Sequence, residues 1–212
     1  MEYPKLKDFE KELRQNISGD VTCDDVTLGI YSTDGSNYQI RPVAVVLPRD
    51  ENDVREAVRI AAGYGVSILP RGGGTSLGGQ AVGSSMVIDF TKYMYSILKL
   101  NVEERWVLVQ PGIVLDELNA VLARHGLMFA PDPATSNRAT IGGMMGNNSS
   151  GTKSIIYGIM KDHVLESRVL LADGTILELK ELPAGEYTRR AGSDNPNTRE
   201  AEILSGFKRI IE

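Results

Sequence analysis

Residues 69–83 read LPRGGGTSLGGQAVG, in which three consecutive glycines follow an arginine and a second glycine pair comes after three further residues. Helices and strands disfavour so many glycines, because glycine loses more backbone entropy on folding than any other residue. The backbone N–H groups from Gly72 to Ser76 carry little side-chain bulk, and Thr75 and Ser76 add hydroxyl donors. Such a nest of amides can bind an anion. The stretch therefore predicts either a phosphate-binding loop or a tight connection where two backbones pack closely.

Two common phosphate-binding patterns do not fit this stretch. The G-x4-G-K-[ST] pattern, begun at Gly73 or Gly74, places Gly79 or Gln80 at the lysine position. The G-x-G-x-x-G pattern needs glycine at position 77, where the chain has leucine. The meaning of the stretch therefore depends on the rest of the chain.

Composition restricts the class of protein. The chain has 212 residues, of which 42% are hydrophobic and 24% charged, with a formal net charge of -5. This length allows one sizeable core or two small ones. Acidic and basic residues are interspersed without a basic stripe, so we expect no nucleic-acid partner. No apolar run is long enough for a transmembrane segment, and the charged residues 1–20 form neither a secretory nor a transit signal, so we expect a cytoplasmic protein.

Cys23 is the only cysteine. A disulfide within the chain and a multi-cysteine metal site are therefore excluded, and we predict no metal site. Two acidic residues follow Cys23 and disfavour a thiolate, so we interpret it as an ordinary residue without reactivity.

Hydrophobic periodicity predicts alternating helices and strands. Helices are expected over residues 3–17, 49–65, 114–126 and 201–212, and strands over 43–48, 66–70, 85–90 and 106–112. The second of these helices has two candidate caps, Asp50 and Asn52. A hairpin is expected over 162–179 with its turn at Asp173-Gly174, and a mobile polar loop over 183–200. The order strand, helix, strand over 43–70 predicts a parallel crossover unit. We expect sub-domains at 35–98 and 99–212, preceded by an N-terminal helix and lead-in over 1–34.

A second segment rich in glycine, serine and asparagine, ATIGGMMGNNSSGTKSIIYG, occupies residues 139–158. We interpret its glycine-rich part, 141–151, as a loop that also allows close approach of a backbone. One such loop is weak evidence. Two of them, separated by about the length of a small sub-domain, predict a long ligand that is held at several points.

The two segments together resemble the FAD-binding domain of the vanillyl-alcohol oxidase and p-cresol methylhydroxylase family, the PCMH-type domain. The resemblance rests on PRGGGTSLGGQ (70–80), on the segment from PDPATSNRATIGG to LLADGTIL (131–177) and on RPVAVVLPRDENDVREAVRIAAGYGVSILPRGGG (41–74). It covers about Tyr31 to Leu179 and is greatest for the D-lactate, glycolate and D-2-hydroxyglutarate dehydrogenase branch. It implies an α+β fold of two lobes. One lobe has a small parallel sheet with helices, the other a larger, mostly antiparallel sheet with helices, and FAD lies between them.

The resemblance also implies which residues contact FAD. Residues 71–80 would surround the pyrophosphate with backbone amides, and 131–136 would line the flavin side. Residues 140–143 would pass near the isoalloxazine ring or the phosphates, and 147–151 near the ribityl and pyrophosphate region. Residues 157–164 would approach the adenosine end. The implied contact residues are Arg71, Gly72, Gly73, Gly74, Thr75, Ser76, Leu77, Gly79, Gln80, Pro131, Asp132, Thr135, Ser136, Thr140, Ile141, Gly142, Gly143, Asn147, Asn148, Ser149, Ser150, Gly151, Tyr157, Gly158, Asp162, His163 and Val164.

Several of these residues have a structural alternative. Asp132, between two prolines, could shape a turn, and so could Asn147 and Asn148. His163 stands at the start of a predicted strand, where a structural or backbone role is favoured. Met144 and Met145 are expected to fill a core rather than touch flavin. The other histidine, His125, precedes a glycine at a helix end, where a cation favours the helix dipole.

Two departures from the family pattern matter for function. Some relatives attach FAD covalently through a histidine in the first loop, where this chain has Thr75 and Ser76, so we predict non-covalent FAD. Family enzymes also carry a substrate-binding cap domain. Here neither of the two histidines stands beside a convincing acid partner for a general base. We therefore interpret the chain as an FAD-binding domain from a longer flavoenzyme, inactive alone, whose catalytic residues lie elsewhere.

The reaction implied by the resemblance is oxidation of a D-2-hydroxy acid of the lactate, glycolate or 2-hydroxyglutarate type, with hydride transfer from substrate C2 to flavin N5. An alcohol or carbohydrate oxidase or a reductase of the same fold stays an alternative, as does a nucleotide-binding module without a redox role. The electron acceptor is open. An iron–sulfur module further along the parent chain is one candidate, although a single cysteine allows none here. The parent protein could also hold the domain at a membrane surface.

Overall fold

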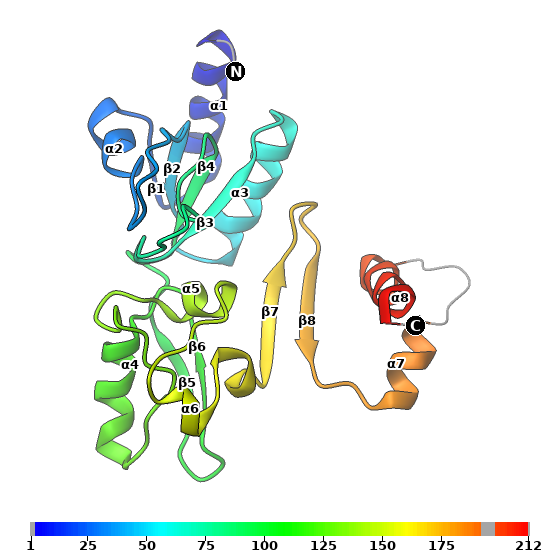
Figure 1. The fold of residues 1–212 in the computed structure, drawn as a ribbon. Helices are drawn as coiled ribbons and strands as arrows, with labels where there is room; N and C mark the ends of the chain where they lie inside the picture. Colours follow the sequence, from blue (N-terminus) through cyan, green and yellow to red (C-terminus); the bar gives the residue numbers. More distant parts are fainter. Residues whose placement is uncertain (1–2, 192–197, 212) are drawn as a thin grey trace. The chain divides into compact units, whose positions relative to one another are not determined.

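The computed structural model describes residues 3–191 and 198–211 of the chain (Figure 1). Internal contacts divide the chain into two compact units, Met1–His163 and Val164–Glu212, called unit 1 and unit 2 here. The predicted sub-domain bounds near residues 34 and 98 both lie inside unit 1 and remain predictions. None of the helices in the described ranges has both the length and the apolar character needed to cross a bilayer.

The first half of unit 1 contains a four-stranded sheet in the order β1-β2-β4-β3. Its strands are β1 (Asp20–Thr22), β2 (Ala44–Leu47), β3 (Ile68–Arg71) and β4 (Met86–Asp89). Strand β1 runs antiparallel to β2, whereas β2 and β3 both run parallel to β4. Val45, Val46 and Val87 are fully buried, as the continuous apolar runs predict for inner strands of a parallel sheet.

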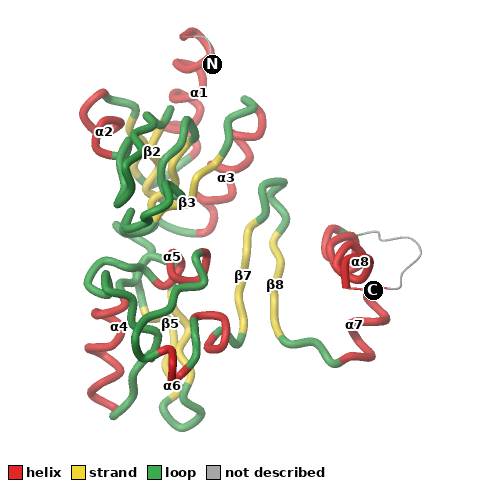
Figure 2. Tube along the Cα trace, viewed as in Figure 1, coloured by secondary structure: helices red, strands yellow, loops and turns green. Residues whose placement is uncertain are grey.

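Three helices pack around this sheet, α1 (Tyr3–Asn16), α2 (Asp25–Ile30) and α3 (Glu51–Gly63). Figure 2 shows α2 and α3 on opposite sides of the strands. Helix α3 begins at the predicted cap Asp50, whose side chain accepts the N–H of Asp53 at 3.0 Å. Helix α1 buries Phe9 and Leu13 completely, on the apolar face that its sequence predicts. The predicted elements over residues 3–90 are thus confirmed, whereas the sequence did not predict β1 and α2.

Strands β3 and β4 are parallel neighbours, and residues 72–85 connect them without a helix. The first glycine-rich stretch therefore starts at the carboxyl end of an edge strand. In open α/β sheets this end of the strands is where ligands bind. The sheet topology thus determines where the loop lies.

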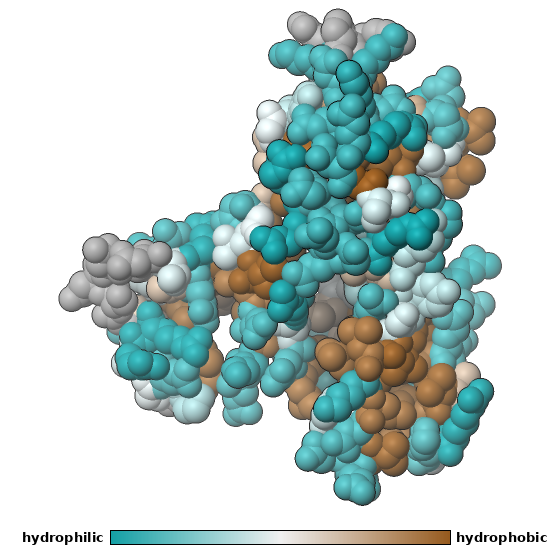
Figure 3. All heavy atoms as spheres, turned by 180° about the vertical axis from the view of Figure 1, so that it is seen from behind, coloured by the Kyte–Doolittle hydropathy of each residue, from teal (hydrophilic) through white to brown (hydrophobic). Residues whose placement is uncertain are grey.

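The second half of unit 1 is built around the antiparallel pair β5 (Ile97–Asn101) and β6 (Trp106–Val109) and helix α4 (Leu115–Leu122). Leu118 and Leu122 of α4 pack against one face of the pair. On the other face Leu108 keeps 53% of its surface exposed, and Figure 3 shows apolar side chains on this part of the molecule. Helix α4 and its end at Gly126 (φ 68°) agree with the prediction, whereas the sequence did not predict β5.

The prediction of a loop over residues 141–151 was wrong for its first part, which forms helix α5 (Ile141–Gly146). Thr140 caps this helix by accepting the N–H of Gly143 at 3.2 Å. Met144 is 1% exposed and anchors the helix in the core, whereas Met145 is 37% exposed and does not fill the core as expected. Capping and burial here outweigh the poor helix propensity of glycine. The short helix α6 (Ser154–Tyr157) follows.

Unit 2 contains the hairpin β7 (Glu166–Leu170) and β8 (Ile176–Lys180), with Gly174 at φ 85° in its turn, as predicted. The expected loop over 183–200 was wrong for residues 184–191, which form helix α7 (Ala184–Ala191), and α8 (Arg199–Ile211) begins before the predicted start. Arg190 pairs with Glu186 one turn earlier in α7, and such pairs favour a helix. Residues 192–197 of the predicted loop lie outside the described residues.

The α+β class of the fold is confirmed. The expected larger antiparallel sheet consists, in the part of the chain that the structure describes, of two separate two-stranded ladders, β5–β6 in unit 1 and β7–β8 in unit 2.

Candidate functional site

The glycine loop, defined as residues 72–80, leaves a row of backbone donors unpaired. Within the described residues, no protein atom accepts a hydrogen bond from the N–H groups of residues 72–77, called the amide row below. These residues are exposed or half-buried. Backbone donors of folded proteins are nearly always satisfied, by protein, water or a ligand. The amide row is therefore available to an acceptor from outside the chain.

Residues 138–140 lie so close to two glycines of this loop that a side chain would not fit at either position. A Cβ on Gly72 would lie 2.1 Å from Thr140 Oγ1, and a Cβ on Gly73 would lie 2.3 Å from the carbonyl oxygen of Arg138. Both distances are shorter than any van der Waals contact. The structure thus brings the start of the glycine loop against residues 138–140, at the entry to helix α5.

The amides that follow Thr140 are committed to the protein. Ile141 N–H donates to the carbonyl of Ile113 and Gly142 N–H to that of Pro111, both at 2.9 Å. The N–H of Gly143 donates to Thr140 Oγ1. Thr140 itself is 2% exposed. Of the two glycine-rich segments, the first therefore carries the longer run of available donors.

Asp132 holds the second segment together. Its Oδ1 accepts the N–H of Lys153 at 2.9 Å, and a Cβ on Gly151 would lie 2.0 Å from its carbonyl oxygen. Asn148 has φ 48° and accepts the N–H of Lys161 at 3.0 Å, while Asn147 N–H donates to Gly143. Asn147 and Asn148 thus have local structural contacts, as their alternative interpretation required. Asp132 instead joins two segments that are 21 residues apart in the chain.

The last predicted contacts lie around a short 3₁₀ turn over Met160–His163. His163 belongs to this turn and not to the start of a strand. Asp162 Oδ2 accepts the N–H of Ile159 at 2.9 Å and closes the turn. His163 Nε2 lies 2.9 Å from the carbonyl oxygen of Tyr157. Gly158 has φ 88°, and a Cβ there would lie 2.7 Å from Asp162 Oδ2. Val164 is the first residue of unit 2.

The remaining predicted residues differ in burial and in their contacts. Leu77 is 83% exposed. Gln80 Oε1 accepts the N–H of Gly78 at 3.1 Å, and Gln80 N–H donates to Ser76 Oγ at 3.2 Å. The carbonyls of Thr135, Ser136 and Ser149 accept hydrogen bonds from backbone N–H groups. Pro131 is buried, and Ser150 is exposed.

Sequence reasoning missed the segment that lies against the glycine loop, residues 31–35. Gly35 N–H donates to the carbonyl of Gly74 at 3.0 Å, and Asp34 Oδ2 accepts the N–H of Ala81 at 3.2 Å. Burial raises the pKa of Asp34, but hydrogen bonds from Ser36 and Ala81 and the charge of Arg71 outweigh it, so this pKa lies below its ordinary value. The run of turn-forming residues over 31–42 was visible in the sequence, but nothing in it indicated the partner.

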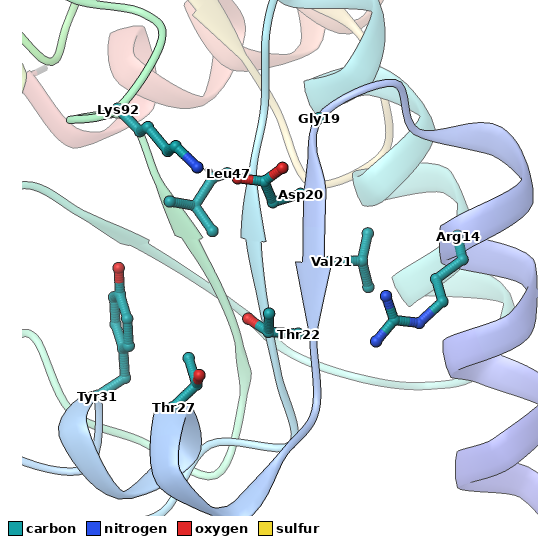
Figure 4. A pocket seen from close by; sticks show the side chains of 9 residues that line it. All are labelled: Arg14, Gly19, Asp20, Val21, Thr22, Thr27, Tyr31, Leu47 and Lys92. Atoms are coloured by element: carbon teal, nitrogen blue, oxygen red, sulfur yellow. Dashed lines mark hydrogen bonds and ion pairs between the residues drawn. The ribbon is translucent and has the colours of Figure 1, made fainter.

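Two hollows of unit 1 lie away from the glycine loop. One of about 580 Å³ is lined by Asp20, Thr27, Tyr31 and Lys92 among others, and one of about 610 Å³ by Tyr64 and its neighbours. Figure 4 shows Lys92 reaching toward Asp20, with Tyr31 and Thr27 on the same side of β1 and Arg14 on the other. Neither hollow is lined by a residue predicted to contact FAD. These two hollows are therefore separate from the glycine loop.

Comparison with known proteins identifies the family of the chain and supports the fold. Residues 42–180 match the model of a family described as FAD binding domain. D-2-hydroxyglutarate dehydrogenase of Pseudomonas putida is 45% identical over 217 aligned positions, which cover 99% of this chain but only 21% of that protein. The chain therefore spans about a fifth of the length of this relative.

Two solved structures share the fold. Alkyldihydroxyacetonephosphate synthase has a TM-score of 0.75 at 27% identity, over 85% of this chain and 38% of its own. p-Cresol methylhydroxylase has a TM-score of 0.75 at 20% identity, over 96% of this chain and 38% of its own. The predicted PCMH-type fold is confirmed, and the chain is similar to a dehydrogenase of the predicted branch. The chain belongs to the family of FAD-binding domains.

Proposed function

We propose that this chain binds FAD non-covalently and is the FAD-binding part of a larger FAD-linked D-2-hydroxy acid dehydrogenase. The observation that carries the proposal is the amide row, residues 72–77, unpaired within the described chain and situated at the carboxyl end of parallel strand β3. An anion at such a position accepts several backbone hydrogen bonds at once.

The residues of the loop fit a pyrophosphate group. Three of the residues in the amide row are glycines, so at Gly72, Gly73 and Gly74 no side chain keeps a phosphate from the backbone. Ser76 Oγ accepts the N–H of Gln80, which leaves its own hydroxyl hydrogen for an anion. The chain carries a net charge of -5, so a diphosphate needs this local set of donors.

The other predicted residues are proposed to line the rest of the cofactor. Residues 131–136 and 140–143 take the flavin side, 147–151 the ribityl region, and 157–158 with 162–164 the adenosine end. Since the N–H groups of residues 141–143 are already bonded within the protein, we propose that this segment contributes shape and carbonyl contacts rather than anion donors.

The proposed substrate class rests on the name of the Pseudomonas putida relative, a D-2-hydroxyglutarate dehydrogenase. The flavin would supply the hydride-accepting chemistry, while this chain binds and orients it. His163 Nε2 is engaged with the Tyr157 carbonyl, and His125 is exposed in the turn after α4. We therefore propose that the group that accepts the hydroxyl proton, the substrate pocket and the electron acceptor belong to other parts of the protein.

Titration of the 212-residue chain with FAD tests the binding proposal. Quenching of flavin fluorescence and a rise in the thermal midpoint are expected, and competition with ADP should show FAD binding at least about tenfold tighter than ADP. Equal affinities for FAD and ADP would instead support a nucleotide-binding module without a redox role. After acid precipitation the flavin should remain in the supernatant, because we propose no covalent bond.

A Gly73→Val variant is the matched test of the loop. Its side chain would collide with the Arg138 carbonyl and obstruct the amide row, so FAD binding should be lost while the far-ultraviolet circular dichroism spectrum stays that of the wild type. A folded wild-type chain that does not quench flavin fluorescence would refute the proposed function. Full FAD binding by Gly73→Val would refute the assignment of the loop.

A further inference from the structure

The side chain of Arg71 closes the glycine loop. Its Nη1 donates to the carbonyl of Ala81 at 2.8 Å, so that residue 71 is bonded to the residue just beyond the loop's far end. Its Nη2 lies against the turn of the loop, since a Cβ on Gly74 would be 2.5 Å from it. Gly74 has φ 63°, a conformation that favours glycine. The loop thus wraps around the guanidinium group of the residue that precedes it.

The same guanidinium ties the loop to residues 31–35. Nη2 donates to the carbonyl of Thr33 at 2.8 Å and Nη1 to that of Tyr31 at 3.3 Å. Gly35 N–H then donates to the carbonyl of Gly74, which completes a second connection between the two segments. These three bonds come from two nitrogens of one planar group, whereas a lysine ammonium carries all its donors on a single nitrogen, so lysine is not an equivalent residue here.

The aromatic ring of Tyr31 supports the guanidinium. The centre of the charge lies 5.2 Å from the ring centroid, within the range of a cation–π contact. The Tyr31 hydroxyl donates to Asp89 Oδ2 at 2.5 Å, and Asp89 is 6% exposed at the end of β4. The position of Arg71 is therefore determined by the core of the parallel sheet.

The charge of Arg71 has no partner of opposite sign in contact. Among the described residues no carboxylate forms an ion pair with it, and three carbonyl oxygens and one aromatic ring surround it instead. The carboxylate of Asp34 senses this charge, which lowers its pKa, but forms no ion pair with it. This charge lies against the same loop that carries the amide row.

We propose that Arg71 is a positioning residue of the FAD site, whose guanidinium closes the glycine loop and orients the amide row without itself touching the cofactor. The proposal rests on the proposed function. The amides of residues 72–77 donate no hydrogen bond to any described residue, so their directions depend on what holds the loop at its ends. Donors that are oriented before binding cost less entropy when the ligand arrives.

The test compares FAD dissociation constants of the wild-type chain, Arg71→Lys and Arg71→Ala. We expect about tenfold or weaker binding for Arg71→Ala and an intermediate value for Arg71→Lys, because lost charge-assisted hydrogen bonds have effects of this order. Guanidinium chloride at about 50 mM, far below denaturing concentrations, should restore part of the affinity of Arg71→Ala, and sodium chloride at the same concentration should not. Arg124→Ala, in the exposed turn after α4, is the matched control and should bind like the wild type.

Hydrogen exchange in the chain without FAD gives a second measurement. The amides of Gly35 and Ala81 are held only if the loop is closed, so they should exchange faster in Arg71→Ala than in the wild type. Wild-type affinity for FAD in Arg71→Ala would overturn the proposal. The proposal would also be overturned if Arg71→Ala bound FAD more weakly, guanidinium did not restore the affinity, and hydrogen exchange at Gly35 and Ala81 were unchanged. If the wild-type chain itself binds no FAD, the proposed function fails, and exchange at Gly35 and Ala81 still decides whether Arg71 closes the loop.

Discussion

Thr140 Oγ1 lies so close to Gly72 that a methyl group on Gly72 would be 2.1 Å away. Thr140 is 2% exposed and caps helix α5, so its side chain cannot turn away without losing the cap. This contact joins the end of the parallel sheet to the second glycine-rich segment. The two glycine-rich segments therefore depend on one another for their positions.

Gly72→Ala should destabilise unit 1 by about 1–3 kcal/mol, because the added methyl overlaps a buried, hydrogen-bonded hydroxyl. Thermal unfolding followed by circular dichroism measures the change. Gly146→Ala is the matched control, since a Cβ there meets nothing within 4 Å and alanine favours the helix. Equal midpoints for Gly72→Ala and the wild type would contradict the contact.

Asp53→Asn should also destabilise the fold, by about 2–3 kcal/mol, because a buried carboxylate that accepts charge-assisted bonds is replaced by an amide. Asp53 is 4% exposed and accepts the N–H groups of Ser18, Gly19 and Arg49 at 2.8–2.9 Å. The amide nitrogen of asparagine would face a donor. Chemical denaturation at neutral pH measures the loss, and an unchanged midpoint would refute it.

The same carboxylate predicts a dependence of stability on pH. Burial raises the pKa of Asp53, but the hydrogen bonds from Arg49, Ser18 and Gly19 outweigh it and hold the pKa below 3.8. Because the pKa of Asp53 is lower in the folded than in the unfolded protein, its carboxylate stabilises the fold fully above the unfolded-state pKa. This stabilisation is lost as the pH falls through the folded-state pKa. The difference in stability between the wild type and Asp53→Asn should therefore shrink below about pH 4. A constant difference from pH 7 to pH 3 would contradict this cause.

Tyr31→Phe should cost about 1–3 kcal/mol, since it leaves Asp89 Oδ2 buried without its donor. Burial, and then the bond to Asp89, raise the pKa of the Tyr31 phenol, so it should ionise only at a higher pH than an ordinary tyrosine. Urea unfolding and ultraviolet titration measure the two effects. Tyr38→Phe, at a tyrosine that is 60% exposed, should change neither.

Cys23 should react slowly with thiol reagents. Burial, followed by the charge of Glu10, raises its pKa to about 11, so roughly a thousandth of it is thiolate at pH 8. The rate of disulfide exchange with an aromatic disulfide should be far below that of a free thiol and should rise steeply with pH. A rate like that of glutathione at pH 8 would contradict the interpretation of Cys23 as unreactive.

Local sequence signals predicted most elements correctly where one residue decides the boundary. Asp50 begins α3, Gly126 ends the turn after α4, and Asp173-Gly174 turns the hairpin of unit 2. The signals failed where contacts with other segments decide. Helix α5 forms despite its glycines because Met144 is buried, and β5 forms because β6 pairs with it.

The sequence by itself determined the two glycine-rich segments, the family and the elements that a local signal marks, since these depend on residue types within short windows. Only the tertiary structure decided that Arg71 bonds the carbonyls of Tyr31, Thr33 and Ala81, and that residues 72–77 have no acceptor within the described chain. These facts depend on which backbone groups meet after folding. Hydrogen bonds between segments far apart in the chain leave no periodic signal in the sequence.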